Sequence, residues 1–163
     1  MRFLLITAVA LQCAFAAKDA PALAMNSTKF IRTAAGDPQD SVDTLRMKAE
    51  RGDPEAEYKL GLAYDVGIGA PQDLGQAAAW YERAAEQGHA GAQFSLGLMY
   101  GNGRGVSQDL VRAHVWLNLA AAASQPGARS ERDLIAKKMT RQQIAEAIRQ
   151  ARAWEPKSPT PPQ

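Results

Sequence analysis

The chain has few of the residues on which much protein chemistry depends. Its 163 residues include one cysteine, Cys13, and two histidines, His89 and His114. Cys13 lies in an apolar N-terminal run that we expect to be removed. The mature chain would then have no thiol, which excludes disulfides, thiolate catalysis and cysteine-bound metal. No set of three or four converging metal ligands can be assembled from the sequence, so neither a metal nor a cofactor is expected.

An excess of charge of one sign is also lacking. The net charge is +2, which gives no reason to expect nucleic acid or an anionic membrane as a partner. The two signs are nevertheless unevenly distributed. Residues 37–86 hold 11 acidic and 5 basic residues, whereas residues 104–157 hold 10 basic and 5 acidic ones. This asymmetry either reflects ordinary solvated faces, or steers a charged partner, or favours head-to-tail contact between copies.

The long hydrophobic run is confined to the N-terminus. A minimal positive start, Met1-Arg2, precedes 14 residues that read FLLITAVALQCAFA. A run of this length is short for a membrane span and typical of a secretory signal peptide. Small-x-small patterns follow, and we expect cleavage after Ala24, or otherwise after Ala16; an uncleaved anchor is the alternative. The prediction is a signal peptide over residues 1–24 and a secreted or periplasmic mature chain that does not bind the membrane.

The centre of the chain contains an internal repeat. Placing residues 52–87 over residues 88–123 matches 15 of 36 positions without a gap, which indicates duplication. The glycine-rich stretch MYGNGRGVSQDL invites comparison with a phosphate-binding loop, but YDVGIGAPQDL occupies the same place in the first copy. Because no strand precedes either copy, we interpret both as turns between helices.

Each copy predicts two helices. In the first, Asp53-Pro54 forms a helix start, and apolar residues then recur at the spacing of one helical face. Glycines end that helix, Asp73 caps the next, and Gly88 stands just beyond its end. Gly61 and Gly97 are expected to let paired helices approach closely, with a seam filled by Leu60, Tyr64, Leu96 and Tyr100. The three tryptophans, Trp80, Trp116 and Trp154, are expected to pack between helices.

These motifs resemble those of a known family. An LG-x-x-Y core, a G-x-G turn, a QD pair before the second helix and an A-x-x-W on it all occur twice. Together they resemble the Sel-one-like repeat (SLR) family. The resemblance implies an all-α fold, an α/α superhelical solenoid of helix-turn-helix repeats related to the tetratricopeptide repeats.

The same resemblance organises the whole chain. We expect a solenoid over residues 42–155, made of a partial repeat (42–51), two full repeats (52–87 and 88–123) and a C-terminal helical cap (124–155). A flexible lead-in, residues 25–41, is expected before it. The proline-rich residues 156–163 are expected to form a disordered tail.

The sequence contains no constellation typical of an enzyme. Some members of the resembled family have been described as acting on β-lactams. Here, however, no G-x-S-x-G or S-x-x-K motif supplies the serine that established enzymes would use. His89 sits at a repeat junction and is expected to pack or cap a helix. We therefore expect no enzyme and assign no catalytic residue.

A binding surface is the remaining candidate site. The resemblance implies a concave side lined by the first helix of each repeat, which would serve a protein or peptide partner. Alternatively, Tyr58 and Phe94 pack against the neighbouring helix pair. We hypothesise a non-catalytic adaptor or scaffold of open oligomeric state; the alternatives are a cell-envelope enzyme acting on a β-lactam or peptidoglycan-type substrate, or a structural assembly subunit. The candidate residues are Glu55, Tyr58, Leu62, Phe94, Leu98 and Asn102.

Overall fold

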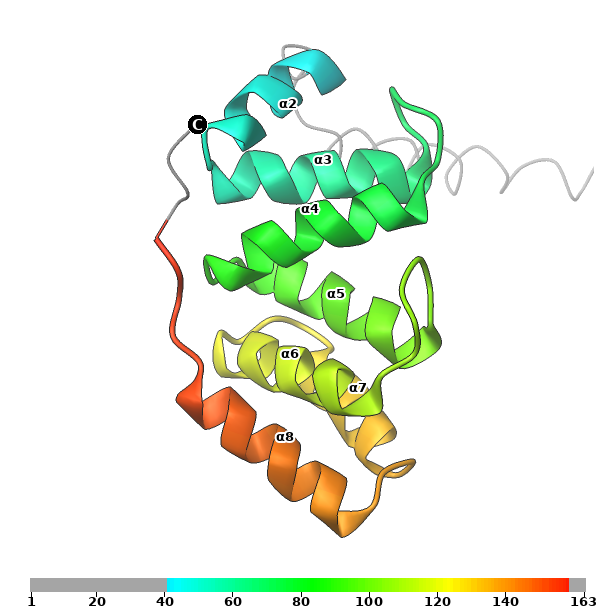
Figure 1. Cartoon of the computed structure of the whole chain (residues 1–163), viewed down its shortest axis with the longest axis vertical. Coiled ribbons are helices and arrows are strands. Elements are labelled where there is room, and N and C mark those ends of the chain that lie inside the picture. Colours follow the sequence, from blue (N-terminus) through cyan, green and yellow to red (C-terminus); the bar gives the residue numbers. More distant parts are fainter. Residues whose placement is uncertain (1–40, 159–163) are drawn as a thin grey trace, which may run out of the picture. The chain divides into compact units, whose positions relative to one another are not determined.

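The computed structural model describes residues 41–158, which belong to one compact unit formed by residues 38–163. The expected signal peptide, most of the expected lead-in and residues 159–163 lie outside the described residues. Within 41–158 the secondary structure is entirely helical, as the sequence predicts (Figure 1). The helices are α2 (Val42–Glu50), α3 (Pro54–Val66), α4 (Leu74–Glu86), α5 (Ala90–Asn102), α6 (Leu110–Ala122), α7 (Ala128–Ala136) and α8 (Arg141–Ala153). None of these helices is long and apolar enough to cross a membrane.

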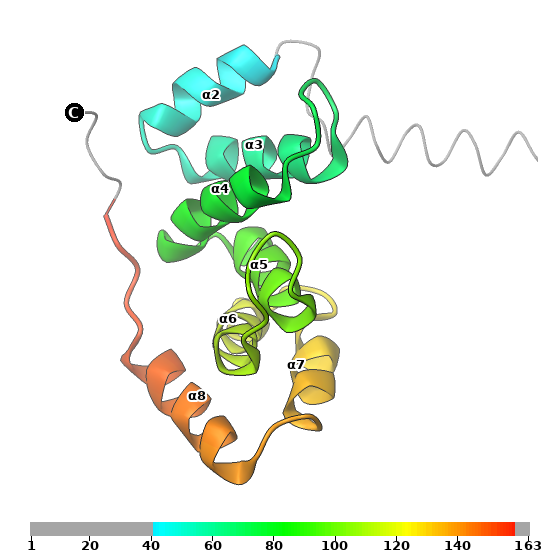
Figure 2. The same ribbon diagram turned by 45° about the vertical axis from the view of Figure 1, so that its right-hand side comes forward.

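The helices stack in chain order as far as α6. Each of α2 to α5 packs against the helix that follows it, so that α3 with α4 and α5 with α6 form two equivalent hairpins (Figure 2). The last two helices, α7 and α8, both pack against α6. The expected solenoid of two-helix repeats is therefore confirmed.

Helix starts follow the capping residues of the sequence. The Asp53 carboxylate accepts hydrogen bonds from the N–H groups of Glu55 and Ala56, and Asp73 and Asp109 cap α4 and α6 in the same way. In α5 the imidazole of His89 takes this role, because its Nδ1 accepts from the N–H of Ala92 at 3.1 Å. The expected capping role of His89 is confirmed.

The glycine loops are turns that close on the preceding helix. Gly67 and Gly103 end α3 and α5 with φ values of 79° and 66°, a left-handed conformation that glycine adopts at little cost. Gln72 then donates its side-chain amide to the carbonyl of Asp65, and Gln108 makes the equivalent bond to Gly101. Backbone N–H groups of the loops are likewise used internally, including those of Gly67, Ile68, Arg104 and the two aspartates of the QD pairs. The loops therefore act as turns.

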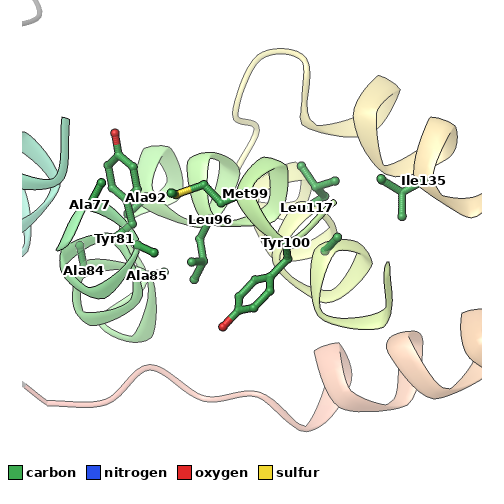
Figure 3. Packing of buried hydrophobic residues seen from close by; sticks show 12 residues of the cluster. Ala77, Tyr81, Ala84, Ala85, Ala92, Leu96, Met99, Tyr100, Leu117 and Ile135 are labelled. Carbon is green, nitrogen blue, oxygen red and sulfur yellow. The ribbon is translucent and has the colours of Figure 1, made fainter. Parts of the chain in front are cut away.

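The two helices of each hairpin meet at a glycine. A Cβ atom on Gly61 would lie 2.7 Å from Cδ1 of Tyr81, and one on Gly97 would lie 2.7 Å from Cγ of Leu117. Because such distances are below van der Waals contact, only glycine permits this approach. The main buried cluster extends from α4 through α5 and α6 to α7 (Figure 3); among its members are Ala77, Tyr81, Ala84, Ala85, Ala92, Leu96, Met99, Tyr100, Leu117 and Ile135.

The C-terminal helices end the stack. Phe94 of α5 lies 3.6 Å from the Cβ position of Gly127, just before α7, and Tyr58 of α3 stands in the same relation to Gly91 of α5, at 3.2 Å. In this respect α7 follows α5 as α5 follows α3. α8 begins with a capping box at Thr140 and packs on α6 through a separate buried cluster made of Val115, Ala147 and Ala151.

The start of the proline-rich tail differs from the prediction. Residues 156–158 were expected to belong to a disordered tail, but the N–H of Lys157 donates to the carbonyl of Glu86 at 2.8 Å. The Lys157 ammonium also lies 2.5 Å from the Glu86 carboxylate. Composition favours disorder here, whereas these two contacts fix the segment against the end of α4. The remainder of the predicted tail lies outside the described residues.

Candidate functional site

The six residues expected to form a binding face lie on α3 and α5. Glu55 and Asn102 are exposed, and the other four are half-buried. Tyr58, Phe94 and Leu98 pack along the edge of the main buried cluster. Leu62 and Leu98 occupy equivalent positions of the two repeats. We call these six residues the first-helix face: Glu55, Tyr58, Leu62, Phe94, Leu98 and Asn102.

The structure brings Glu55 and Tyr58 together through His89. The Tyr58 ring stacks on the His89 ring with centroids 4.5 Å apart, and Nε2 of His89 lies 3.0 Å from a Glu55 carboxylate oxygen. Because Nδ1 of His89 accepts from a backbone N–H, its ring hydrogen is on Nε2 and is donated to Glu55. Burial and the charge of Glu55 raise the pKa of the Tyr58 phenol, which keeps it protonated. This cluster joins α3 to the start of α5.

The two aromatic residues of the first-helix face contribute to packing between successive hairpins. Tyr58 contacts His89 and lies 5.7 Å, between centroids, from Tyr81, while Phe94 reaches Gly127. Both rings are half-buried, so each retains some exposed surface beside these contacts. Asn102 stands apart from them, at the C-terminal end of α5.

Glu57 is a buried carboxylate, whereas the sequence predicts an ordinary exposed charge at this position. Its side chain is 0% exposed and lies 3.0 Å from the guanidinium of Arg83, while Gln87 donates to it at 2.6 Å. Burial raises the Glu57 pKa, and the nearby Arg83 charge opposes that rise. The equivalent residue in the second repeat is Gln93, a neutral group. The sequence did contain one sign of this burial: equivalent positions of the two repeats hold Glu57 and Gln93, which have nearly the same size and shape.

His114 is another buried titratable group. It stands where the first repeat has Ala78, and its Nδ1 has no hydrogen-bond partner. Burial and the charge of Arg132 lower its pKa, so the imidazole is neutral at neutral pH. Over residues 41–158, no group of three or more His, Cys, Asp or Glu side chains is placed to hold a metal ion.

A groove between α2 and α4 was not expected from the sequence. Its volume is about 540 Å³. On one wall Arg46 donates to the Tyr64 hydroxyl at 2.7 Å and lies 3.6 Å from Asp43. On the other wall the Arg83 guanidinium lies over the Trp80 ring, 4.7 Å from its centroid. We call this the α2/α4 groove; it is lined by Arg46, Glu50, Tyr64, Pro71, Gln72, Asp73, Gln76 and Trp80.

A related groove lies between α4 and α6, the second helices of the two full repeats. The chain's own C-terminal segment lies in it. Trp154 packs edge-on against Trp116, with ring centroids 6.4 Å apart and planes at 76°. Lys157 pairs with Glu86 beyond it. The remaining space is about 240 Å³. We call this the α4/α6 groove; it is lined by Glu82, Glu86, Arg112, Val115, Trp116, Gln150 and Trp154.

The fold and the repeated positions define an α/α solenoid built of two-helix repeats. A model of the Sel1 repeat matches residues 54–89 and 90–124, each of which spans one hairpin. The chain therefore carries two Sel1 repeats.

Two solved structures show the same repeat architecture. A protective antigen of uropathogenic Escherichia coli with an SLR fold is 34% identical, with a TM-score of 0.67, over 69% of this chain and 24% of its own. A Sel1 repeat protein from Oxalobacter formigenes is 44% identical, with a TM-score of 0.54, over 56% of this chain and 27% of its own.

Two curated proteins match shorter stretches. Mouse DAP3-binding cell death enhancer 1 is 39% identical over 30% of this chain and 10% of its own length. Chitin synthase regulator SKT5 of Malassezia restricta is 49% identical over 24% of this chain and 3% of its own. The match therefore spans a small part of each curated protein.

Proposed function

We propose that this chain is a secreted or periplasmic repeat module that binds a protein or peptide partner and does not catalyse a reaction. Sel1 repeats are generally protein–protein interaction modules, and one curated relative is named for binding another protein. The observation that carries the proposal is the duplicated hairpin, which presents equivalent half-buried apolar residues, Leu62 and Leu98, on successive first helices. Polar residues flank them, as is common around a peptide-binding patch.

The location is part of the same proposal and rests on the N-terminal sequence. Expression of the full chain, followed by mass measurement of the mature product, tests it. A product that begins at Met25 is expected, and one that begins at Ala17 would move the cleavage site to the alternative position. Recovery of the full-length chain in the membrane fraction would contradict a cleaved signal peptide.

Capture from a cell-envelope extract tests the binding face. The bait is the mature chain, and the variant Leu62→Asp/Asn102→Arg changes the first-helix face at two positions outside the His89 cluster. Loss of a specifically captured protein in this variant is the expected result. Ala79→Asp, which changes an exposed position of α4, is the matched control. Equal capture by both variants would contradict the proposed face.

A further inference from the structure

We propose that the α2/α4 groove is a second binding site, which accepts an extended segment of a partner protein with an aromatic residue followed, three positions later, by a lysine. This site is separate from the first-helix face and does not depend on it. The proposal rests on the internal repeat and on the segment that the chain places in its own α4/α6 groove.

The walls of the two grooves are related by the repeat. A shift of 36 residues superposes four lining positions of the first groove on four of the second. One aromatic and one acidic position are the same in both grooves. The equivalent pairs are Arg46 and Glu82, Glu50 and Glu86, Gln76 and Arg112, and Trp80 and Trp116.

The chain itself shows what such walls bind. In the α4/α6 groove, residues 154–157, which read WEPK, contact the two wall positions that are identical in both grooves. Trp154 packs against Trp116, and Lys157 pairs with Glu86. The N–H of Lys157 adds a main-chain hydrogen bond. An extended segment with this pattern therefore satisfies one aromatic and one acidic wall residue together.

The α2/α4 groove offers the same two wall residues, Trp80 and Glu50, with more room. Its volume is about 540 Å³, whereas 240 Å³ remains beside Trp154 in the other groove, and the Arg83 guanidinium lies over one face of the Trp80 ring. Arg46 replaces Glu82 on the wall and adds a cation near Glu50. An acidic residue between the aromatic residue and the lysine, like Glu155 in WEPK, would complement that charge.

Binding of a synthetic peptide tests the site. The probe is a fluorescein-labelled peptide, AWEPKS, with the sequence of residues 153–158, and anisotropy is measured against the full mature chain. We expect saturable binding that is weakened roughly fivefold or more by Glu50→Lys, because attraction to the peptide lysine becomes repulsion. Replacing the lysine of the peptide by glutamate should restore binding to this variant. Asp133→Lys, on α7, is the matched charge-reversal control and should bind like the wild type.

Absence of saturable binding, or either of the next two results, would overturn the proposal. Binding that is unaffected by Glu50→Lys but weakened by Glu86→Lys would place the peptide in the α4/α6 groove. Concentration-dependent self-association that Glu50→Lys abolishes would make a second copy of the chain the occupant. The first-helix variant Leu62→Asp/Asn102→Arg should bind the peptide like the wild type. The peptide experiment therefore tests the α2/α4 groove independently of the capture experiment.

Discussion

At the scale of single residues, the glycines of the LG pairs allow the two helices of each hairpin to approach closely. Gly61 and Gly97 lie where the two helices of a hairpin meet, and each faces a large buried side chain, Tyr81 or Leu117. The sequence predicts this role, because a glycine inside an apolar helical pattern costs stability unless close packing compensates for it.

Gly97→Ala should therefore destabilise the fold. The added methyl group would lie 2.7 Å from Leu117 Cγ. Leu117 is fully buried and therefore has little freedom to move away. We expect a loss of about 1–3 kcal/mol in the free energy of unfolding, measured by urea denaturation. Gly75→Ala, at an exposed position in the first turn of α4, is the control and should be neutral or slightly stabilising. Equal effects of the two substitutions would contradict the packing argument.

Glu57 shows why residue-level chemistry was harder to predict. The carbonyls of Ala49 and Ala85, at equivalent ends of second helices, each accept a side-chain hydrogen bond at 3.2 Å. In the second repeat Gln93 donates that bond directly. A carboxylate cannot donate, so in the first repeat Arg83 supplies the donor and also faces Glu57. The exchange depends on a partner 26 residues away, which periodicity does not reveal.

The buried Glu57 carboxylate should make stability depend on pH. Its pKa is raised in the folded chain, so protonation favours folding. Its contribution is fully present below the ordinary value near 4.5 and is lost as the pH rises through the folded pKa. The difference in unfolding free energy between wild type and Glu57→Gln should therefore shift in favour of the wild type as the pH falls from 8 toward about 4.5. Urea denaturation across this range measures it.

The control for this titration is a carboxylate without burial. Glu155→Gln removes an exposed acid and should leave the pH profile parallel to that of the wild type. If the stability of Glu57→Gln varied with pH in parallel with the wild type, the charge of Arg83 would fully offset the effect of burial on the Glu57 pKa. That result would contradict the raised pKa inferred here.

At the scale of elements, helix starts and turns could be predicted because their causes are local. Caps such as Asp53, Asp73 and Thr140, and left-handed positions such as Gly67 and Gly103, are determined by neighbouring residues. The docking of residues 154–158 on α4 could not be predicted, since it depends on contacts between Lys157 and Glu86 that are distant in the sequence. The grooves between second helices were missed for the same reason.

The N-cap of α6 offers a test of these local rules. Asp109 accepts from the N–H groups of Val111 and Arg112, both at 3.0 Å. Asp109→Ala should lower the free energy of unfolding by about 1 kcal/mol, because two N–H groups at the helix start lose their acceptor. Asp109→Asn retains an acceptor oxygen and should recover most of that loss. Thermal denaturation of both variants checks this, and equal losses would mean that the carboxylate charge matters more than the hydrogen bonds.

At the scale of the whole stack of helices, the stability of each helix should depend mainly on its neighbours. Each helix from α2 to α5 packs on the next, and α8 packs on α6 through Val115, Ala147 and Ala151. In a stack of this kind the free energy of unfolding is approximately a sum of element and neighbour contributions. A local defect at one end should therefore affect nearby helices more than distant ones.

Ala147→Asp tests this coupling. Ala147 is 0% exposed at the contact between α8 and α6, so the substitution buries a charge without a partner and should detach α8. Hydrogen exchange measured by mass spectrometry should show protection lost in α8 and residues 154–158, reduced in α6, and retained in α2 and α3. Ala145→Asp, on the exposed side of the same helix, should leave the pattern unchanged. Uniform loss of protection from α2 to α8 would instead show that the repeats unfold as one cooperative block. In that case the contacts between neighbouring helices would not contribute independently to stability.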